Sequence, residues 1–195
     1  MNNLKKLKLL VASALLSSTG VYANDCTDTT ATNCGITISG NQTIDIGSSI
    51  TTDKRGVQVT GDSNTLTIDG DITVESSVKS RFALNVASDG NDNIINMTGD
   101  ISTISTGGAS GMHGIRISVN SSSNTVNVTG NVSTTGNNSS GILIIEGGDN
   151  NNVTLFGNIT TSGSENSNGV RITGQTNNFG INNTITVNGD ISTVS

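Results

Sequence analysis

The sequence predicts an all-β chain that folds as a right-handed parallel β-helix, a solenoid of about six coils with three short strands per coil. Three observations lead to this fold class. One strand phrase recurs along the chain, for example as "NTLTIDGDITV" and as "NTITVNGDISTVS". Its apolar residues alternate with polar ones, as a strand with one buried face requires. The chain has no Trp or Pro and few aromatic residues, so small and β-branched side chains must fill a thin core.

The repeat units begin at a column of amide residues, and successive starts are 22, 29, 31, 27 and 32 residues apart. The first start is Gln42. Short phrases separated by spacers in this range are typical of a solenoid, in which each unit buries its apolar face only by stacking on the next. The remaining starts are expected to hydrogen-bond to one another along the stack as an internal ladder. The members of this ladder are Asn64, Asn93, Asn124, Asn151 and Asn183.

Each unit supplies three strands and three turns. The first strand points two apolar residues inward, such as Val126 and Val128, and ends at a Gly-Asp or Gly-Asn corner. A second strand follows the corner and begins with an apolar residue such as Val132. A third strand follows a variable polar loop. It reads GVQV (56–59), ALNV (83–86), GIRI (114–117), GILI (141–144) and GVRI (169–172) in successive units.

The N-terminus has the order of a secretory signal peptide. Residues 1–23 contain three lysines, a short apolar run and a small-residue stretch that ends at Ala23. We therefore expect the chain to be exported, and the apolar run is too short to span a bilayer, so no membrane span is predicted. Residues 24–40 are predicted to form an N-terminal cap. A disulfide between Cys26 and Cys34 is expected there, with two free thiols or a metal pair as the alternatives.

The repeats are assigned to residues 41–195. The last unit reaches Ser195 before its third strand, so we expect the repeats to be truncated at the C-terminus. Removal of residues 1–23 leaves six basic side chains against fifteen acidic ones, a formal net charge of −9. This charge argues against a nucleic-acid partner.

One basic patch is predicted on this acidic rod. Lys54, Arg55, Lys79 and Arg81 fall in equivalent spacers of adjacent units. Clustered basic side chains bind polyanions, so we predict a possible polyanion-binding patch for a sulfated or acidic glycan. The alternative is a pair of solvated loops that break up the acidic surface.

Three patterns resemble catalytic or metal sites, and the repeat offers a structural interpretation of each. The phrase GDSN (61–64) lacks the downstream Asp-x-x-His of the hydrolase family that it resembles and is predicted to be an inter-coil turn. His113 has no recurring partner and is expected to be exposed in a loop. A column of mostly Asp and Asn residues, at the corner after the first strand of each unit, is predicted to be exposed to solvent. It is not predicted to bind calcium ions, because calcium requires six to eight oxygen ligands. Its members are Ser49, Asp71, Asp100, Asn131, Asn158 and Asp190. We predict no catalytic residue, no metal site and no cofactor.

A signal peptide followed by imperfect coils of the form N-T-h-x-h-x-G-[DN]-[IV]-[ST] resembles the N-terminal part of an autotransporter passenger domain of a Gram-negative bacterium. The resemblance covers roughly residues 36–195. It implies a surface-exposed or secreted protein, often an adhesin or a virulence factor. Family members typically carry a C-terminal outer-membrane β-barrel that exports the passenger.

The expected function is that of a non-catalytic secreted or cell-surface stalk with a role in adhesion or host interaction. Its partners would be the export machinery and a host-surface protein or glycan. Ligands are expected at variable loops near residues 75–82, 105–113, 135–140 and 162–168, because loops carry interaction sites on a rigid scaffold. One alternative is a polysaccharide-processing β-helix enzyme whose active-site coils are missing. Paired carboxylates and aromatic platforms would indicate such an enzyme. The other alternative is a non-functional gene remnant.

Overall fold

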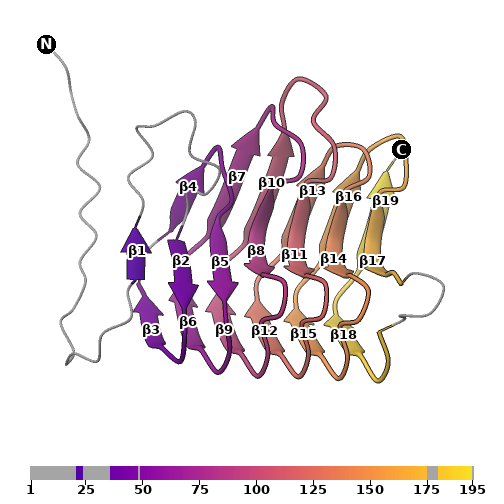
Figure 1. Cartoon of the computed structure of the whole chain (residues 1–195). Helices are drawn as coiled ribbons and strands as arrows, with labels where there is room; N and C mark the ends of the chain where they lie inside the picture. The colour runs from indigo at the N-terminus through magenta and orange to yellow at the C-terminus, as the bar shows by residue number, and fades with distance from the viewer. Residues whose placement is uncertain (1–20, 24–35, 48, 175–179, 195) are drawn as a thin grey trace, which may run out of the picture.

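The structure is a computed structural model that describes residues 21–23, 36–47, 49–174 and 180–194. These residues form nineteen strands arranged in three sheets that run along a common axis (Figure 1). No helix occurs in this part of the chain, and the all-β class and the parallel β-helix with three strands per coil are confirmed. None of the described residues forms a helix long and apolar enough to cross a membrane.

Sheet A contains seven strands. In spatial order they are β1 (Val21–Ala23), β2 (Ile36–Ser39), β5 (Val57–Thr60), β8 (Phe82–Val86), β11 (His113–Ile117), β14 (Ser140–Ile144) and β17 (Asn168–Ile172). Strand β1 pairs with β2 in the antiparallel sense, and all the other strands of the sheet pair in parallel.

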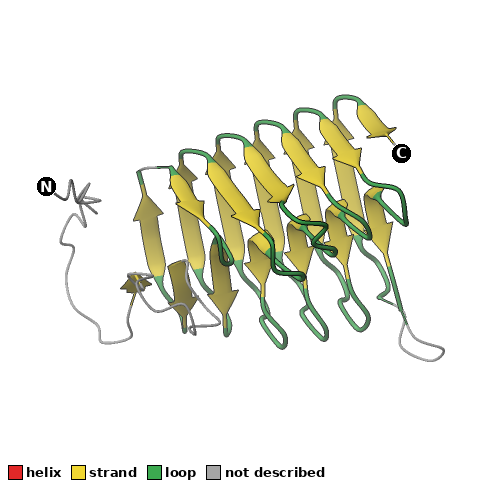
Figure 2. Ribbon diagram, turned by 90° about the horizontal axis from the view of Figure 1, so that it is seen from above, coloured by secondary structure: helices red, strands yellow, loops and turns green. Residues whose placement is uncertain are grey.

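Sheets B and C contain six parallel strands each. Sheet B consists of β3 (Thr43–Ile46), β6 (Thr65–Asp69), β9 (Ile94–Thr98), β12 (Thr125–Thr129), β15 (Asn152–Phe156) and β18 (Thr184–Asn188). Sheet C consists of β4 (Ile50–Thr52), β7 (Ile72–Ser76), β10 (Ile101–Ser105), β13 (Val132–Thr135), β16 (Ile159–Ser162) and β19 (Ile191–Val194). The chain visits B, C and A in turn, so β3–β17 make five coils and β18–β19 begin a sixth (Figure 2).

The first two strands lie in segments that were predicted to be a signal peptide and an N-terminal cap. Strand β1 comprises the last three residues of the predicted signal peptide. Strand β2 lies in the range predicted to form a cap, and it pairs with β5 from Ile36 onward, so the parallel part of sheet A begins there. Cys26 and Cys34 lie outside the described residues, and their disulfide stays a prediction.

The core is a narrow aliphatic column enclosed by the three sheets. In β12, Val126 and Val128 are fully buried, and their register partners in the next coil are Val153 and Leu155. Each inward position therefore stacks on a similar side chain above and below. Burial of such a side chain contributes about 1.5–3 kcal/mol to the stability of the fold. Each coil buries its inward side chains only by stacking on its neighbours.

The asparagine column at the start of each sheet B strand forms a continuous ladder inside the corner. The side-chain oxygen of Asn93 accepts from the backbone N–H of Asn64 at 2.9 Å and from its Nδ2 at 2.8 Å. Asn93 donates in the same way to Asn124, and the pattern repeats through Asn151 to Asn183. These paired bonds satisfy polar groups that would otherwise be buried without partners.

Candidate anion-binding face

All four arginines of the chain and its only histidine lie on sheet A or directly before one of its strands. Arg55 and Arg81 precede β5 and β8, His113 and Arg116 lie in β11, and Arg171 lies in β17. The six parallel strands of this sheet contain no Asp or Glu. Basic side chains are thus concentrated on one face of the rod, although the whole chain has a formal net charge of −6.

A glycine position at or just before the start of the sheet A strands decides which side chains face outward. Gly141 points into the coil, since a Cβ built on it would lie 2.4 Å from Cγ2 of Ile159 in sheet C. The following residue, Ile142, is also fully buried. Because two consecutive residues point inward, the residue before this pair and the residue after it point outward. In β11 these outward residues are His113 and Arg116, which flank the inward pair of Gly114 and Ile115.

Phe82 is the centre of the basic face. The guanidinium carbon of Arg116 lies 4.4 Å from the ring centroid of Phe82, and that of Arg55 lies 5.3 Å from it. The imidazole of His113 stacks on the same ring at 5.7 Å, with an angle of 14° between the planes. Cations near an aromatic face are attracted by its quadrupole. We call Arg55, Arg81, Phe82 and Arg116 the arginine cluster.

Neutral amides accept hydrogen bonds from two of the three guanidinium groups of this cluster. Nη1 of Arg55 donates to Oε1 of Gln58 at 3.0 Å, and Nη1 of Arg116 donates to Oδ1 of Asn85 at 3.4 Å. Burial and then the charge of Arg55 lower the pKa of Arg116 to about 10. Burial and then the charge of Arg81 lower the pKa of Arg55. Both pKa values are lowered first by burial and then by like charges held close together, and Arg116 stays protonated at neutral pH.

His113 is buried in β11, with 8% of its surface exposed, so the exposed loop position expected for it is wrong. It is covered because it stacks on Phe82, and its Nδ1 accepts a hydrogen bond from the backbone N–H of Ser140 at 3.0 Å. Burial, followed by the charges of Arg116 and Arg171, lowers the pKa of His113 to about 4. The imidazole is therefore neutral at pH 7.

An open hollow of about 360 Å³ adjoins the arginine cluster toward the C-terminal coils. Outward residues of sheet A line it, namely His113, Leu143 and Arg171, together with Ile145 and Thr173 just beyond the strands. Loops that join sheet C to sheet A line the other side, with Ser80, Ser110 and Asn138. These loops lie side by side, since the N–H of Ser80 donates to the carbonyl of Ser110 at 2.9 Å.

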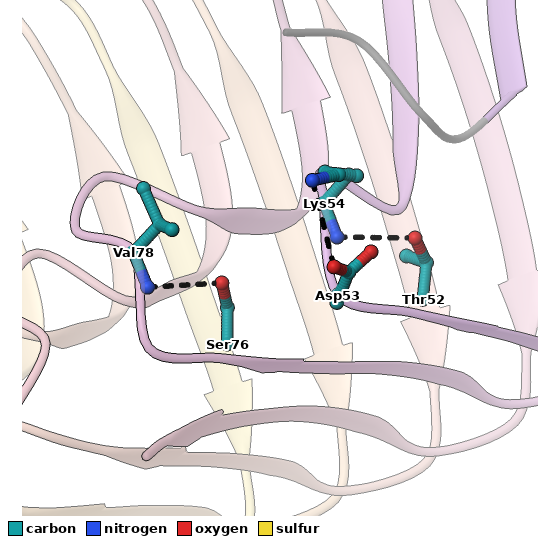
Figure 3. A network of polar contacts seen from close by, with 5 residues as sticks. All are labelled: Thr52, Asp53, Lys54, Ser76 and Val78. Atoms are coloured by element: carbon teal, nitrogen blue, oxygen red, sulfur yellow. Dashed lines mark hydrogen bonds and ion pairs between the residues drawn. The ribbon is translucent and has the colours of Figure 1, made fainter. Parts of the chain in front are cut away.

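The structure divides the predicted polyanion patch. Arg55 and Arg81 come close enough for their charges to interact, but Lys54 places Nζ 3.5 Å from Oδ2 of its own neighbour Asp53. Figure 3 shows this pair, with the backbone N–H of Lys54 bonded to Thr52. Lys79 is exposed in the loop between β7 and β8.

The sequence interpretation missed Arg116, Arg171 and Phe82 as members of this face. A signal was present, because GIRI and GVRI place an arginine at the same outward position of the repeat. That position belongs to the strand, whereas Arg55 and Arg81 precede strands. Only the packing at the start of the sheet A strands reveals that arginines within the strands and arginines before the strands face the same side of the rod.

The other candidate residues have structural partners. In the GDSN turn, Ser63 has φ of 59° and Oδ1 of Asp62 accepts from the N–H of Asn91 at 2.8 Å. In the corner column, Oδ1 of Asp71 accepts from the N–H of Asp100 at 2.8 Å, and similar bonds continue to Asn131, Asn158 and Asp190. Within the described residues, no three His, Cys, Asp or Glu side chains are placed to hold a metal ion.

The chemistry that this face offers is anion binding. Guanidinium groups bind sulfate, carboxylate or phosphate through charge-assisted hydrogen bonds, often two at once. His113 already uses Nδ1 for the N–H of Ser140, and its low pKa removes it as a proton donor near pH 7.

No family model, curated protein or solved structure matches the chain.

Proposed function

We propose that the chain is a non-catalytic, exported β-helix stalk, similar to an autotransporter passenger, that attaches by binding an anionic polysaccharide to sheet A. The protein would act in secreted form or at the bacterial surface, in adhesion or host interaction. The signal-peptide pattern and the resemblance of the repeats support export. The convergence of all four arginines on one sheet without carboxylates carries the proposed ligand class.

The environment of the arginines favours a glycan as the ligand. Only 4% of the surface of Phe82 is exposed, so its ring is not available for stacking against nucleic-acid bases. Hydroxyl and amide groups of Ser110, Asn138 and Thr173 lie beside Arg171 in the hollow. Such groups match the hydroxyls of a sugar, while the guanidinium matches its acidic substituent.

Binding of the purified chain to immobilised dextran sulfate, with dextran as the neutral reference, tests the proposal. We expect binding to dextran sulfate alone, weakened by added salt. Arg116→Gln should lower the affinity about tenfold or more, since a hydrogen bond to a charged group contributes about 1.5–3 kcal/mol. Lys79→Gln removes the same charge from an exposed loop position and should change the affinity by about twofold at most.

Two results would contradict the proposal. The ligand class is wrong if the chain ignores dextran sulfate, or if Arg116→Gln and Lys79→Gln have equal effects. Fractionation of cells that express the full gene tests the location, because an exported stalk must appear in the medium or at the surface. Recovery of the uncleaved chain only in the cytoplasm would exclude the adhesion role.

A further inference from the structure

Resting on the proposed function, we further propose that one linear acidic polysaccharide lies along the axis of the rod and bridges two subsites on sheet A. One subsite is the arginine cluster, and the other is the hollow around Arg171. The ligand must therefore be an extended chain with acidic groups on several sugars, because a single charged sugar reaches only one subsite.

The register of sheet A sets the direction of the ligand. The Cα atoms of Arg116, Leu143 and Arg171 pair in succession across β11, β14 and β17, so both arginines occupy one column parallel to the axis. Arg55 lies two residues before the first residue of β5, which is four strand steps from β17. At about 4.8 Å per step, the two ends of the basic face are about 19 Å apart.

The hollow offers groups for a sugar as well as for its acidic substituent. Leu143 and Ile145 are apolar, and Ile145, which is half-buried, can contact the C–H face of a pyranose ring. Asn138 and Thr173 can bond the ring hydroxyls. Arg171 is exposed, so its guanidinium is accessible to a sulfate or a carboxylate.

The stacked loops give the second subsite a wall. Ser80, Ser110 and Asn138 come from three consecutive loops, and the N–H of Gly111 donates to the carbonyl of Asn137 at 2.8 Å. Because the wall is built from loops of successive coils, it runs in the same direction as the arginine column. A ligand laid along the axis contacts both, whereas one laid across the strands does not.

Calorimetric titration with a length series of sulfated heparin oligosaccharides, from disaccharide to octasaccharide, tests this proposal. The wild-type affinity should rise steeply, by about tenfold or more, once the oligosaccharide spans both subsites, because the second contact becomes intramolecular. Arg171→Gln should abolish this rise, so that the octasaccharide binds the variant about as weakly as the disaccharide does. The amide NMR signal of Thr173 should shift when the octasaccharide binds to the wild-type chain, and this shift should be smaller in Arg171→Gln.

A charge-conserving variant provides the control. Arg171→Thr combined with Thr160→Arg moves the same charge to an exposed position of β16, in sheet C of the same coil. If binding depends only on the total charge, this double variant should show the wild-type rise of affinity with oligosaccharide length. If binding depends on two subsites, the rise should be lost, as in Arg171→Gln. Both variants change exposed side chains, and their melting curves will verify folding.

The outcomes separate this inference from the proposed function. If dextran sulfate binds but oligosaccharide affinity grows evenly with length and the relocated charge restores it, the two-subsite arrangement is wrong and polyanion binding stands. If no sulfated ligand of any length binds, the proposed function itself fails. Equal binding of duplex DNA, with equal sensitivity to Arg171→Gln, would overturn the choice of a polysaccharide.

Discussion

The side-chain oxygen of Asn124 accepts two hydrogen bonds from Asn93 in the preceding coil, from the backbone N–H at 3.0 Å and from Nδ2 at 2.9 Å. Asn124 is fully buried, so Asn124→Ala leaves the backbone N–H of Asn93 without a partner and leaves Nδ2 of Asn93 with only the carbonyl of Gly61. We expect the free energy of unfolding to fall by about 2–4 kcal/mol, because each buried unsatisfied group costs about 1–3 kcal/mol. Urea denaturation followed by circular dichroism measures this loss.

Asn127→Ala is the matched control for the ladder variant. Asn127 lies three residues further along the chain, within β12, and its Nδ2 donates to Oδ1 of Asn96 at 2.9 Å on the exposed side. Its loss should change stability by about 0.5 kcal/mol or less. Equal effects of the two variants would mean that the inner ladder has no special structural role.

Val128→Asp tests the register of the core. Val128 is fully buried in β12 and stacks between Met97 and Leu155, so the new carboxylate would be buried without a partner. We expect loss of the folded structure in the coils on both sides, seen as a lower melting temperature and a smaller folded signal. Asn127→Asp introduces the same charge at the adjacent outward position, and its melting curve should stay close to wild type.

Gly141→Ala tests the tight contact at the start of the sheet A strands. The added methyl would lie 2.4 Å from Cγ2 of Ile159 and 2.7 Å from the carbonyl oxygen of Gly169. Overpacking of this kind costs about 1–3 kcal/mol, which chemical denaturation will detect. Gly47→Ala is the control, since no heavy atom lies within 4 Å of that added methyl. Equal stability of Gly141→Ala and the wild-type chain would show that the contact of Gly141 with Ile159 and Gly169 can widen without cost.

The pKa of His113 predicts a stability loss in acid. Above pH 6.5 the imidazole is neutral in both the folded and the unfolded chain. Below pH 6.5 the imidazole becomes protonated in the unfolded chain, whereas in the folded chain it stays neutral until about pH 4. Stability should therefore fall between these values, by about 3 kcal/mol at about 1.4 kcal/mol per pKa unit. Unfolding midpoints measured across this pH range will show the slope.

His113→Gln supplies the reference for that slope. Glutamine keeps an acceptor for the N–H of Ser140 but does not titrate. The variant should be less stable at pH 7, because stacking on Phe82 is lost, and should show a shallower decline in acid. Parallel curves for the two proteins would show that other groups cause the acid sensitivity.

The strands and their inward residues were predictable from the sequence because alternation has one spatial meaning in a two-faced strand. Val126 and Val128 were assigned inward from their spacing alone, and they are fully buried. The corners were equally readable, since Gly-Asp pairs mark sharp turns. In both cases a residue's position within one unit determines its environment.

The basic face was less predictable because it depends on contacts between units. Lys54 and Arg55 are neighbours in sequence, yet one pairs with Asp53 and the other lies beside Phe82. Simple alternation along β11 would point His113 inward, as it does Ile115. Because Gly114 also points inward, His113 points outward instead. The stacking of His113 on a ring of the previous coil has no counterpart in the local pattern.

The asparagine ladder also couples the folding of each coil to that of the next. In every rung the earlier coil donates and the later coil accepts, from Asn64 through to Asn183. The buried donors of one coil are therefore satisfied only when its successor docks, so folding that begins in one coil should spread to its neighbours along the stack. Loss of one rung should weaken the coupling between the coils on either side of it. Such a chain can begin to fold while its later coils are still being synthesised.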